Sequence, residues 1–133
     1  MRLTVQTDYA LRTLMFLASQ DGSQKIDDIA RIYDISKNHL MKVVQRLVAN
    51  GFVNSQRGRG GGLMLADKPE QINIGAVVRA LENTDEFVEC QLGADNHCIV
   101  TPVCGLKSML NGAVGAFLAH LDQFTLADVM KKK

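Results

Sequence analysis

Long apolar runs are missing from this sequence. No stretch approaches the ~18 consecutive apolar residues that a membrane-spanning helix needs, and the N-terminal MRLTVQTDYA lacks the uninterrupted apolar core of a signal peptide. We therefore expect a cytoplasmic protein without a membrane partner. The chain also lacks a GxxxxGK[ST] phosphate-binding loop and any recognisable nucleophile–base pair. Its 133 residues suffice for one domain with an appendage, and we do not expect an enzyme.

Cysteine is scarce, and its count is odd. The three cysteines, Cys90, Cys98 and Cys104, lie in one stretch, ECQLGADNHCIVTPVC, with the spacing C-x7-C-x5-C. Disulfides are rare in the cytosol, so we expect metal ligands or redox sensors instead. A tetrahedral metal or an iron–sulfur cluster usually takes four protein ligands. The sequence is thus one cysteine short of a complete site.

Acidic residues are absent between Ile35 and Ala66, a stretch that carries five basic residues. The asymmetry extends further, because residues 1–66 hold nine Lys and Arg against five Asp and Glu, whereas residues 67–130 hold three against nine. A local basic face on a chain with a formal net charge of +1 favours a footprint for nucleic-acid phosphates. On charge alone, a solvated surface that simply lacks acids is the alternative.

The pattern within this basic stretch predicts a helix-turn-helix. In SKNHLMKVVQRLVANG, apolar residues recur at helical spacing, Ser36 is a good N-cap and Gly51 a good stop. The apolar stripe consists of Leu40, Val43, Val44, Leu47 and Val48. The opposite face collects Asn38, Lys42, Gln45 and Ala49, with Arg46 at its edge. Asn and Gln can read adenine, and Lys can hold phosphate or guanine.

Two further helices are predicted upstream of this recognition helix. IDDIARIYDIS indicates a short helix with Ile29 and Ala30 turned inward, and the turn after it completes the helix-turn-helix. Nearer the N-terminus, an amphipathic stripe would complete a three-helix core. That stripe consists of Leu11, Leu14, Met15 and Ala18.

A β-wing is predicted directly after the recognition helix. Phe52-Val53 and Leu63-Met64-Leu65 read as two short strands around a glycine-rich turn, whose Arg57 and Arg59 would reach a minor groove. GxGxxG fails at Leu63, which argues against a nucleotide loop. The expected fold class is mainly α with a small β-wing, a winged helix-turn-helix. The candidate DNA-binding residues are Ser36, Lys37, Asn38, His39, Lys42, Gln45, Arg46, Arg57, Arg59 and Gly60.

The second half of the chain predicts two helices separated by an acidic loop. The first is marked by an amphipathic stripe of Ile74, Val77, Val78 and Leu81, with Asn73 as a candidate cap. Thr101-Pro102 is a strong start signal, so we expect a long helix from there to about Phe124, with Cys104 in its first turn, where the helix dipole favours a thiolate. A long apolar helix outside a small domain suggests pairing with a second copy. TLAD at 125–128 resembles a capping box.

These elements suggest three regions. Residues 1–83 would form the winged helix-turn-helix domain, with the wing at about 52–66. Residues 84–104 would form a cluster-binding loop, and residues 101–133 the dimerisation helix and tail.

Over essentially its whole length, the chain resembles the dimeric winged-helix repressors that carry an iron–sulfur cluster, most closely their nitric-oxide-sensing branch. Five motifs in this order carry the resemblance: LTVQTDYALRTLMFLA, ISKNHLMKVVQRL, RGRGGGLML, the three cysteines with TPVCGLK, and FTLADVM. It implies a homodimer on double-stranded operator DNA. It also implies one iron–sulfur cluster per subunit, 4Fe-4S in preference to 2Fe-2S, held by Cys90, Cys98 and Cys104. Nitric oxide attack on that cluster would lift repression.

The resemblance also suggests a fourth ligand. A related regulator of iron–sulfur cluster assembly uses a histidine three residues after the third cysteine, where this chain has the cationic Lys107. In one branch of the nitric-oxide sensors the ligand is instead an aspartate early in the first helix, donated by the other subunit. Asp8 in QTDYA matches that position. A carboxylate is a hard, weakly held ligand of iron, so it would leave that iron open to a small diatomic molecule.

Several alternatives stay open. Asp8 or Thr7 could simply cap the first helix, and Glu86, Glu89 or Asp95 could donate an oxygen to the metal instead. Zinc could be held by the cysteines with His97, although adjacent side chains such as His97 and Cys98 rarely converge on one metal. The alternative function is accordingly a zinc- or iron-dependent winged-helix regulator that responds to a different signal.

Overall fold

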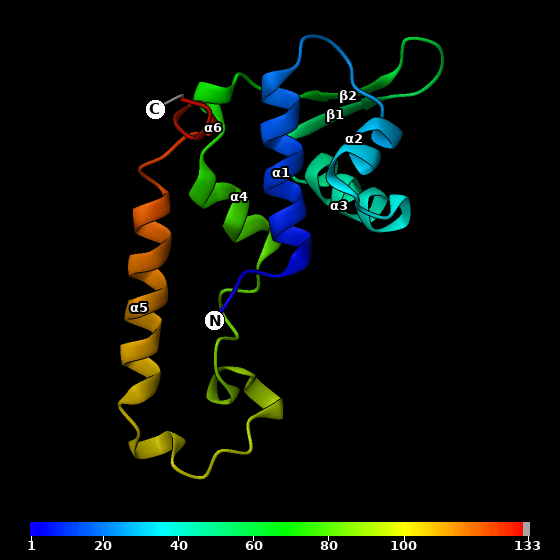
Figure 1. Ribbon diagram of the computed structural model, residues 1–133. Coiled ribbons are helices and arrows are strands. Elements are labelled where there is room, and N and C mark those ends of the chain that lie inside the picture. The colour runs from blue at the N-terminus through cyan, green and yellow to red at the C-terminus, as the bar shows by residue number, and fades with distance from the viewer. Residues whose placement is uncertain (132–133) are drawn as a thin grey trace.

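The computed structural model describes residues 1–131; Lys132 and Lys133 of the predicted tail lie outside the described residues. The helices and strands are α1 (Val5–Ser19), α2 (Ile26–Tyr33), α3 (Lys37–Ala49), β1 (Val53–Gln56), β2 (Gly62–Leu65), α4 (Ile74–Leu81), α5 (Leu106–Leu121) and α6 (Leu126–Val129). Figure 1 shows α1 to α4 and the two strands gathered in a head (residues 1–82), with α5 standing beside it. A cysteine segment (residues 83–105), made of loops and short 3₁₀ turns, joins α4 to α5.

The helix-turn-helix forms as the sequence predicts. The Ser36 hydroxyl accepts a hydrogen bond from the backbone N–H of His39 at 3.2 Å and so caps α3. The helix ends at Asn50, and Gly51 follows at a φ of +79°, a conformation that favours glycine. Val48 is the exception within the predicted stripe, since it is 39% exposed. The buried face of α3 consists of Leu40, Val43, Val44 and Leu47.

The buried face of α1 differs from the predicted stripe. Leu14 is fully buried, as expected, but its buried neighbours include Ala10 and two threonines, Thr7 and Thr13. The Thr13 hydroxyl donates to a backbone carbonyl one turn earlier at 2.8 Å, so threonine can be buried without an unsatisfied polar atom. A hydrophobic pattern alone misses such positions. The other predicted stripe residues, Leu11, Met15 and Ala18, pack against the core while staying partly exposed.

The wing is a two-stranded antiparallel sheet. Val53 pairs with Leu65 at its base and Gln56 with Gly62 near the turn. Val53 and Leu63 are buried, so the base of the wing belongs to the core of the head. Backbone hydrogen bonds between Gln24 and Leu63, at 2.9 and 2.7 Å, attach β2 to the loop between α1 and α2. The wing therefore has a fixed base and a free turn.

The long helix α5 begins later than the sequence predicts. Thr101-Pro102 starts a 3₁₀ turn (Thr101–Val103), after which Cys104 is extended and Gly105 precedes α5. The Thr101 hydroxyl donates to the carbonyl of Cys98 at 2.8 Å and does not cap α5. The start signal is thus correct for the turn and wrong for the helix. Cys104 lies outside the first turn of α5, so the helix-dipole argument for its thiolate does not apply.

The chain returns to the head after α5. The backbone N–H of Leu126 donates to the carbonyl of Ile72 at 2.8 Å, and that of Ile74 donates to the carbonyl of Phe124 at 3.0 Å. Thr125 and Asp128 form the predicted capping box of α6, and Leu126 is fully buried in the core. Within residues 1–131, no helix combines the length and apolar character needed to cross a membrane.

Candidate DNA-binding face and cysteine segment

The helix α3 presents a polar ridge between two hollows. The recognition ridge consists of Asn38, Lys42 and Gln45, which are all exposed. On one side, Lys42 and His39 border a small cavity against Tyr9 of α1. On the other side, a groove of about 550 Å³ separates α3 from the wing. A polar helix edge with open space on both flanks suits insertion into a DNA major groove.

The groove between α3 and the wing gathers further basic side chains. Lys37 and Arg57 line it together with Lys25, the N-cap residue of α2. The Lys37 ammonium lies 2.8 Å from the Asp27 carboxylate, so part of its charge is neutralised within the protein. Sequence reasoning missed Lys25, because it lies outside the acid-free stretch. Its position immediately before the first helix of the helix-turn-helix could have indicated a DNA contact.

The tip of the wing carries the remaining candidates. Arg57, Arg59 and Gly60 are all exposed. The turn passes through Gly58 and Gly60 with φ values of +95° and +74°, which L side chains rarely adopt. Glycine at these positions therefore permits a tight turn, and the arginines beside it remain accessible to a phosphate backbone or a minor groove.

Arg46 occupies a different environment from the rest of the predicted set. Its guanidinium donates to the backbone carbonyl of Leu81 at 2.9 Å and to the side-chain oxygen of Gln6 at 2.8 Å. The side chain is partly buried and links α3 to α4 and α1. The sequence predicts a DNA contact for Arg46, whereas in the structure its donors have partners within the head.

Asp8 does not cap α1. The N-cap is Thr4, whose hydroxyl accepts from the backbone N–H of Thr7 at 3.4 Å, so the capping roles considered for Thr7 and Asp8 are wrong. Asp8 lies in the first turn of the helix, where Arg12 donates to both of its carboxylate oxygens, at 3.1 and 2.8 Å. Its side chain is 48% exposed. The carboxylate is thus accessible to a neighbouring subunit and paired with a cation.

All three cysteines are free thiols in the cysteine segment. Cys90 lies in the 3₁₀ turn Glu89–Gln91, and Cys98 is held by a hydrogen bond from its backbone N–H to the Asn96 side chain at 3.0 Å. Cys104 is exposed, and the other two are half-buried. Among residues 1–131, no three His, Cys, Asp or Glu side chains gather at metal-binding distance. This holds also for sets that combine the thiols with His97 or the loop carboxylates of the described residues.

The donor set nevertheless fits an iron–sulfur cluster by its chemistry. Thiolates are the soft ligands that such clusters take, and three accessible thiols lie within a single connecting segment without a disulfide. Among residues 1–131, one chain in this conformation brings no three of these ligands together, whether or not Asp8 is counted. Assembly would thus require the cysteine segment to close around the cluster, which is compatible with a segment built of loops and 3₁₀ turns.

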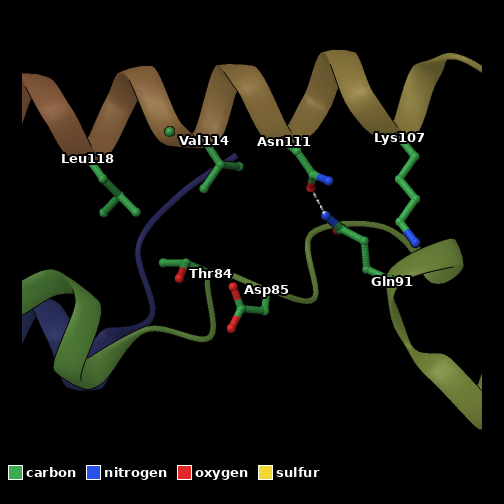
Figure 2. A pocket seen from close by; sticks show the side chains of 8 residues that line it. Thr84, Asp85, Gln91, Lys107, Asn111, Val114 and Leu118 are labelled. Carbon is green, nitrogen blue, oxygen red and sulfur yellow. Dashed lines mark hydrogen bonds between the residues drawn. The ribbon is translucent and has the colours of Figure 1, made fainter.

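Contacts along α5 fix the cysteine segment on one side. Figure 2 shows Lys107, Asn111 and Leu118 on the face of α5 turned toward residues 84–91. The Gln91 amide donates to the Asn111 side chain across this gap. Lys107, at the position where a related regulator has a histidine ligand, lines this cavity.

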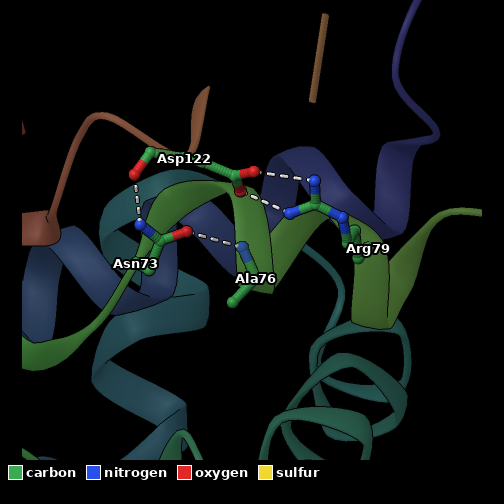
Figure 3. A network of polar contacts seen from close by, with 4 residues as sticks. All are labelled: Asn73, Ala76, Arg79 and Asp122. Atoms are coloured by element: carbon green, nitrogen blue, oxygen red, sulfur yellow. Dashed lines mark hydrogen bonds and ion pairs between the residues drawn. The ribbon is translucent and has the colours of Figure 1, made fainter. Parts of the chain in front are cut away.

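The other end of α5 is held by α4. In Figure 3, Arg79 donates both terminal nitrogens to the Asp122 carboxylate, and Asn73 donates to the Asp122 carbonyl at 2.7 Å. The Arg79 hydrogen bonds lower the pKa of the Asp122 carboxyl, and those with Asp122 raise the pKa of Arg79. The cysteine segment and α5 together form an excursion from the head. The α4 helix holds both ends of this excursion, because its last residues also lead into the cysteine segment.

Together these features define a class of protein. A helix-turn-helix with a β-wing, an exposed basic ridge and a long extra helix describes a winged-helix DNA-binding regulator. The chain belongs to the Rrf2 family, described as iron-dependent transcriptional regulators, whose model matches residues 3–132. The predicted fold class and the absence of an enzymatic role are thereby confirmed, and the protein is a transcriptional regulator.

Relatives and solved structures agree with this assignment. The HTH-type transcriptional regulator NsrR of Bacillus licheniformis is 52% identical over 132 residues, covering 98% of this chain and 92% of that protein. NsrR of Bacillus subtilis is 52% identical over 135 residues, covering 100% and 92%. The structure of T. potens IscR matches with a TM-score of 0.77 at 25% identity, covering 98% of this chain and 86% of that one. The resemblance stated from the sequence motifs is confirmed.

Proposed function

We propose that this protein is a homodimeric repressor that binds palindromic operator DNA while an iron–sulfur cluster is present, and that nitric oxide releases it. The observation that carries the proposal is the placement of all three cysteines in the segment that joins the DNA-binding head to α5. The similarity to NsrR over nearly the full chain supports the same conclusion. Such a regulator would act in the cytoplasm.

The cluster would be held by Cys90, Cys98 and Cys104 of one subunit and Asp8 of the other, one cluster per subunit, as 4Fe-4S or 2Fe-2S. When bound, it would supply iron that reacts with nitric oxide, most readily where a carboxylate is the ligand. The chain's own residues would hold the cluster and connect it to the head. Asp8 would leave Arg12 to reach the partner. The cysteine segment follows α4 and leads into α5, whose far end is bonded back to α4 through Asp122, so closure of the segment would be transmitted to the head.

The DNA contacts would come from both flanks of the groove. Ser36, Lys37, Asn38, His39, Lys42 and Gln45 would act from the N-terminal part and exposed face of α3. Arg57, Arg59 and Gly60 would act from the wing. We add Lys25, whose exposed ammonium lines the same groove and has the position of a phosphate contact.

The helix α5 would form the dimer. It leaves large apolar side chains in contact with solvent, including Met109, 72% exposed, Leu106, 55% exposed, and Phe117, 39% exposed. A second copy would bury them in an isologous interface, which places two heads on one two-fold operator.

Anaerobic purification tests the cofactor. Iron and acid-labile sulfide should be present in comparable amounts in a brown protein, and Mössbauer spectra should identify the cluster type. Nitric oxide should bleach the visible band and release operator DNA in the same titration. Colourless protein with stoichiometric zinc would instead support the zinc-dependent regulator. The matched variant Cys98→Ser should lack the cluster.

Titration of operator DNA against salt tests the recognition face. Each lost phosphate contact lowers the slope of log affinity against log salt by about one. Lys42→Ala and Lys25→Ala should show this loss, and Arg59→Ala should weaken binding through the minor groove. Lys68→Ala is the control, since Lys68 is exposed but lies outside the groove. Unchanged affinity and slope in all three variants would contradict the assignment.

A further inference from the structure

Arg46 joins three parts of the head that the proposed function needs to communicate. It lies on α3, between the buried residues Val43 and Leu47 and the exposed ridge. One terminal nitrogen donates to the carbonyl of Leu81, the last residue of α4, at 2.9 Å. The other donates to the Gln6 side chain in the first turn of α1, at 2.8 Å. A guanidinium satisfies two acceptors on different helices because its donors are fixed in a planar fork.

Each acceptor lies at a point where the head connects to an expected cluster ligand. Gln6 lies in the same helical turn as Asp8, and Leu81 immediately precedes the residues that lead to Cys90. The two acceptor regions are also bonded to each other, since Glu82 accepts from the backbone N–H and the hydroxyl of Thr4, at 2.6 and 2.9 Å. Arg46 therefore contacts the two places where a change at the cluster would enter the head.

The location suits a charged donor that is not free for DNA. The carbonyls at the end of a helix lack intrahelical partners and carry the negative end of the dipole, so a guanidinium there stabilises the end of α4. Removing it would leave the Leu81 carbonyl and the Gln6 amide to solvent and would remove the side-chain link from α3 to the end of α4 and the first turn of α1. Both α3 and α4 pack against α1 (Figure 1), and Arg46 adds a hydrogen bond from α3 to the end of α4.

We propose that Arg46 is a positioning residue that couples the cysteine segment and the first turn of α1 to the recognition helix, and that it does not contact DNA. This inference rests on the proposed function, because it needs a cluster-dependent change in DNA affinity. The absence of a phosphate contact by Arg46 and its coupling of the cluster to the recognition helix can be measured separately.

The salt dependence of operator binding separates positioning from contact. Arg46→Met keeps the apolar stem and removes the guanidinium, and it should leave the salt slope at the wild-type value. Lys42→Met is the matched control on the same helix and should lower the slope by about one. A slope lowered by about one in Arg46→Met would overturn the proposal, because it would show a phosphate contact.

The ratio of operator affinities with and without the cluster tests coupling. In Arg46→Met that ratio should fall about fivefold or more, the lower end of couplings between distant sites, while Lys42→Met keeps the wild-type ratio. If the wild-type affinity depends on the cluster and Arg46→Met has the same ratio as the wild type, this inference alone is overturned. A ratio of one in the wild type overturns the proposed function and the coupling with it.

Gln6→Met keeps the test valid if Arg46→Met does not fold. It removes one acceptor at an exposed position and should lower the ratio in the same direction, with no additional effect in an Arg46→Met background. Additive effects in the double variant would contradict a shared contact. In the cluster-free protein, amide hydrogen exchange at Leu81 and Glu82 should be faster in Arg46→Met than in the wild type. Equal exchange rates would show that the guanidinium does not hold this end of α4.

Discussion

At the scale of single residues, Asp8 shows how a local contact can change the role expected from a position in the sequence. Thr4 caps α1, so the helix does not need Asp8 for that purpose. Its partner is Arg12, one turn later, and the pair is about half exposed. Exposed ion pairs contribute little to folding, typically about 0–1 kcal/mol. Little stability is therefore lost when the carboxylate exchanges Arg12 for another cation.

Asp8→Asn tests the fourth ligand. The fold should be nearly as stable as the wild type, but the visible spectrum of the cluster should change and its reaction with nitric oxide should be faster, because an amide is a poorer, neutral ligand that leaves the iron more open. Thr4→Ala is the control: it removes the actual cap, should cost about 1 kcal/mol in urea unfolding, and should leave the spectrum unchanged. A wild-type spectrum in Asp8→Asn would direct the search to Glu86, Glu89, Asp95 and His97.

Gly75→Ala tests the contact between α4 and α5. In an exposed helix this change usually stabilises by up to ~1 kcal/mol, but here an added Cβ would overlap the carboxylate and backbone nitrogen of Asp122. We expect a loss of about 1–3 kcal/mol in the free energy of unfolding, as for overpacking in general. The double variant with Asp122→Ala should lose less than the sum of the two single changes. Additive losses would refute the overlap.

At the scale of elements, α5 is attached to the head through charges at one end. The Arg79 hydrogen bonds lower the pKa of Asp122 below its ordinary value of 3.8. Hydrogen bonds from Lys131, and then from Thr125, lower the pKa of Asp128 to about 2. Both carboxyls have a depressed pKa in the folded state, so their contribution to stability is present above the ordinary pKa and is lost as the pH falls through the lowered one.

The urea concentration at the midpoint of unfolding should accordingly decrease as the pH is lowered from about 4 to about 2. The lowered pKa values of these two carboxyls set this window. Asp122→Asn should flatten part of this decline, because the amide does not titrate. Circular dichroism at a fixed protein concentration measures both proteins. An equally steep decline in the variant would show that Asp122 does not contribute to acid sensitivity.

Met109→Glu tests the role of α5 in dimerisation. A carboxylate in the centre of the exposed apolar face should convert the dimer to a monomer in sedimentation experiments, because burying an unpaired charge is costly. Asn111→Glu is the control on the other face of the helix, where Asn111 contacts Gln91; it should remain dimeric. Dissociation of the control but not of Met109→Glu would place the interface on the opposite face.

Elements with local signals were predictable from the sequence, and contacts between distant residues were not. Ser36, Asn73 and Thr125 cap their helices as predicted, because a cap needs only residues one turn away. The inward position of Arg46 depends on Leu81, far along the chain, and no local pattern indicates it. The predicted position of Cys104 in the first turn of the long helix was wrong for a related reason. A Thr-Pro pair starts a turn, but it does not determine whether the turn continues as an α-helix.

At the scale of the whole molecule, the cysteine segment and α5 form one excursion held at both ends by α4. Glu82 leads into it, and Asp122 and Phe124 return from it to Arg79 and Ile74. Two such heads must present recognition helices about 34–36 Å apart, or a multiple of that distance, to read a palindrome. A change in how the excursion closes would alter this separation in both subunits at once.

Cys98→Ala tests this arrangement. If α5 rather than the cysteine segment forms the interface, as proposed, the variant should remain a folded dimer while it loses the cluster and specific operator binding. Sedimentation, iron content and operator titration measure the three properties. A monomeric Cys98→Ala protein would show that the cysteine segment itself carries the dimer contact.

The burial of Leu126 has a consequence for how the protein is made. This side chain is fully buried in the core of the head, and α6 packs against α1 and the turn at Pro69–Gln71. During synthesis, α1 to α4 leave the ribosome long before Leu126 does, so the hydrophobic core of the head stays incomplete through most of translation. By the time that core closes, all three thiols have already emerged. The three thiols of the cysteine segment are therefore exposed on the nascent chain before the reading head is complete.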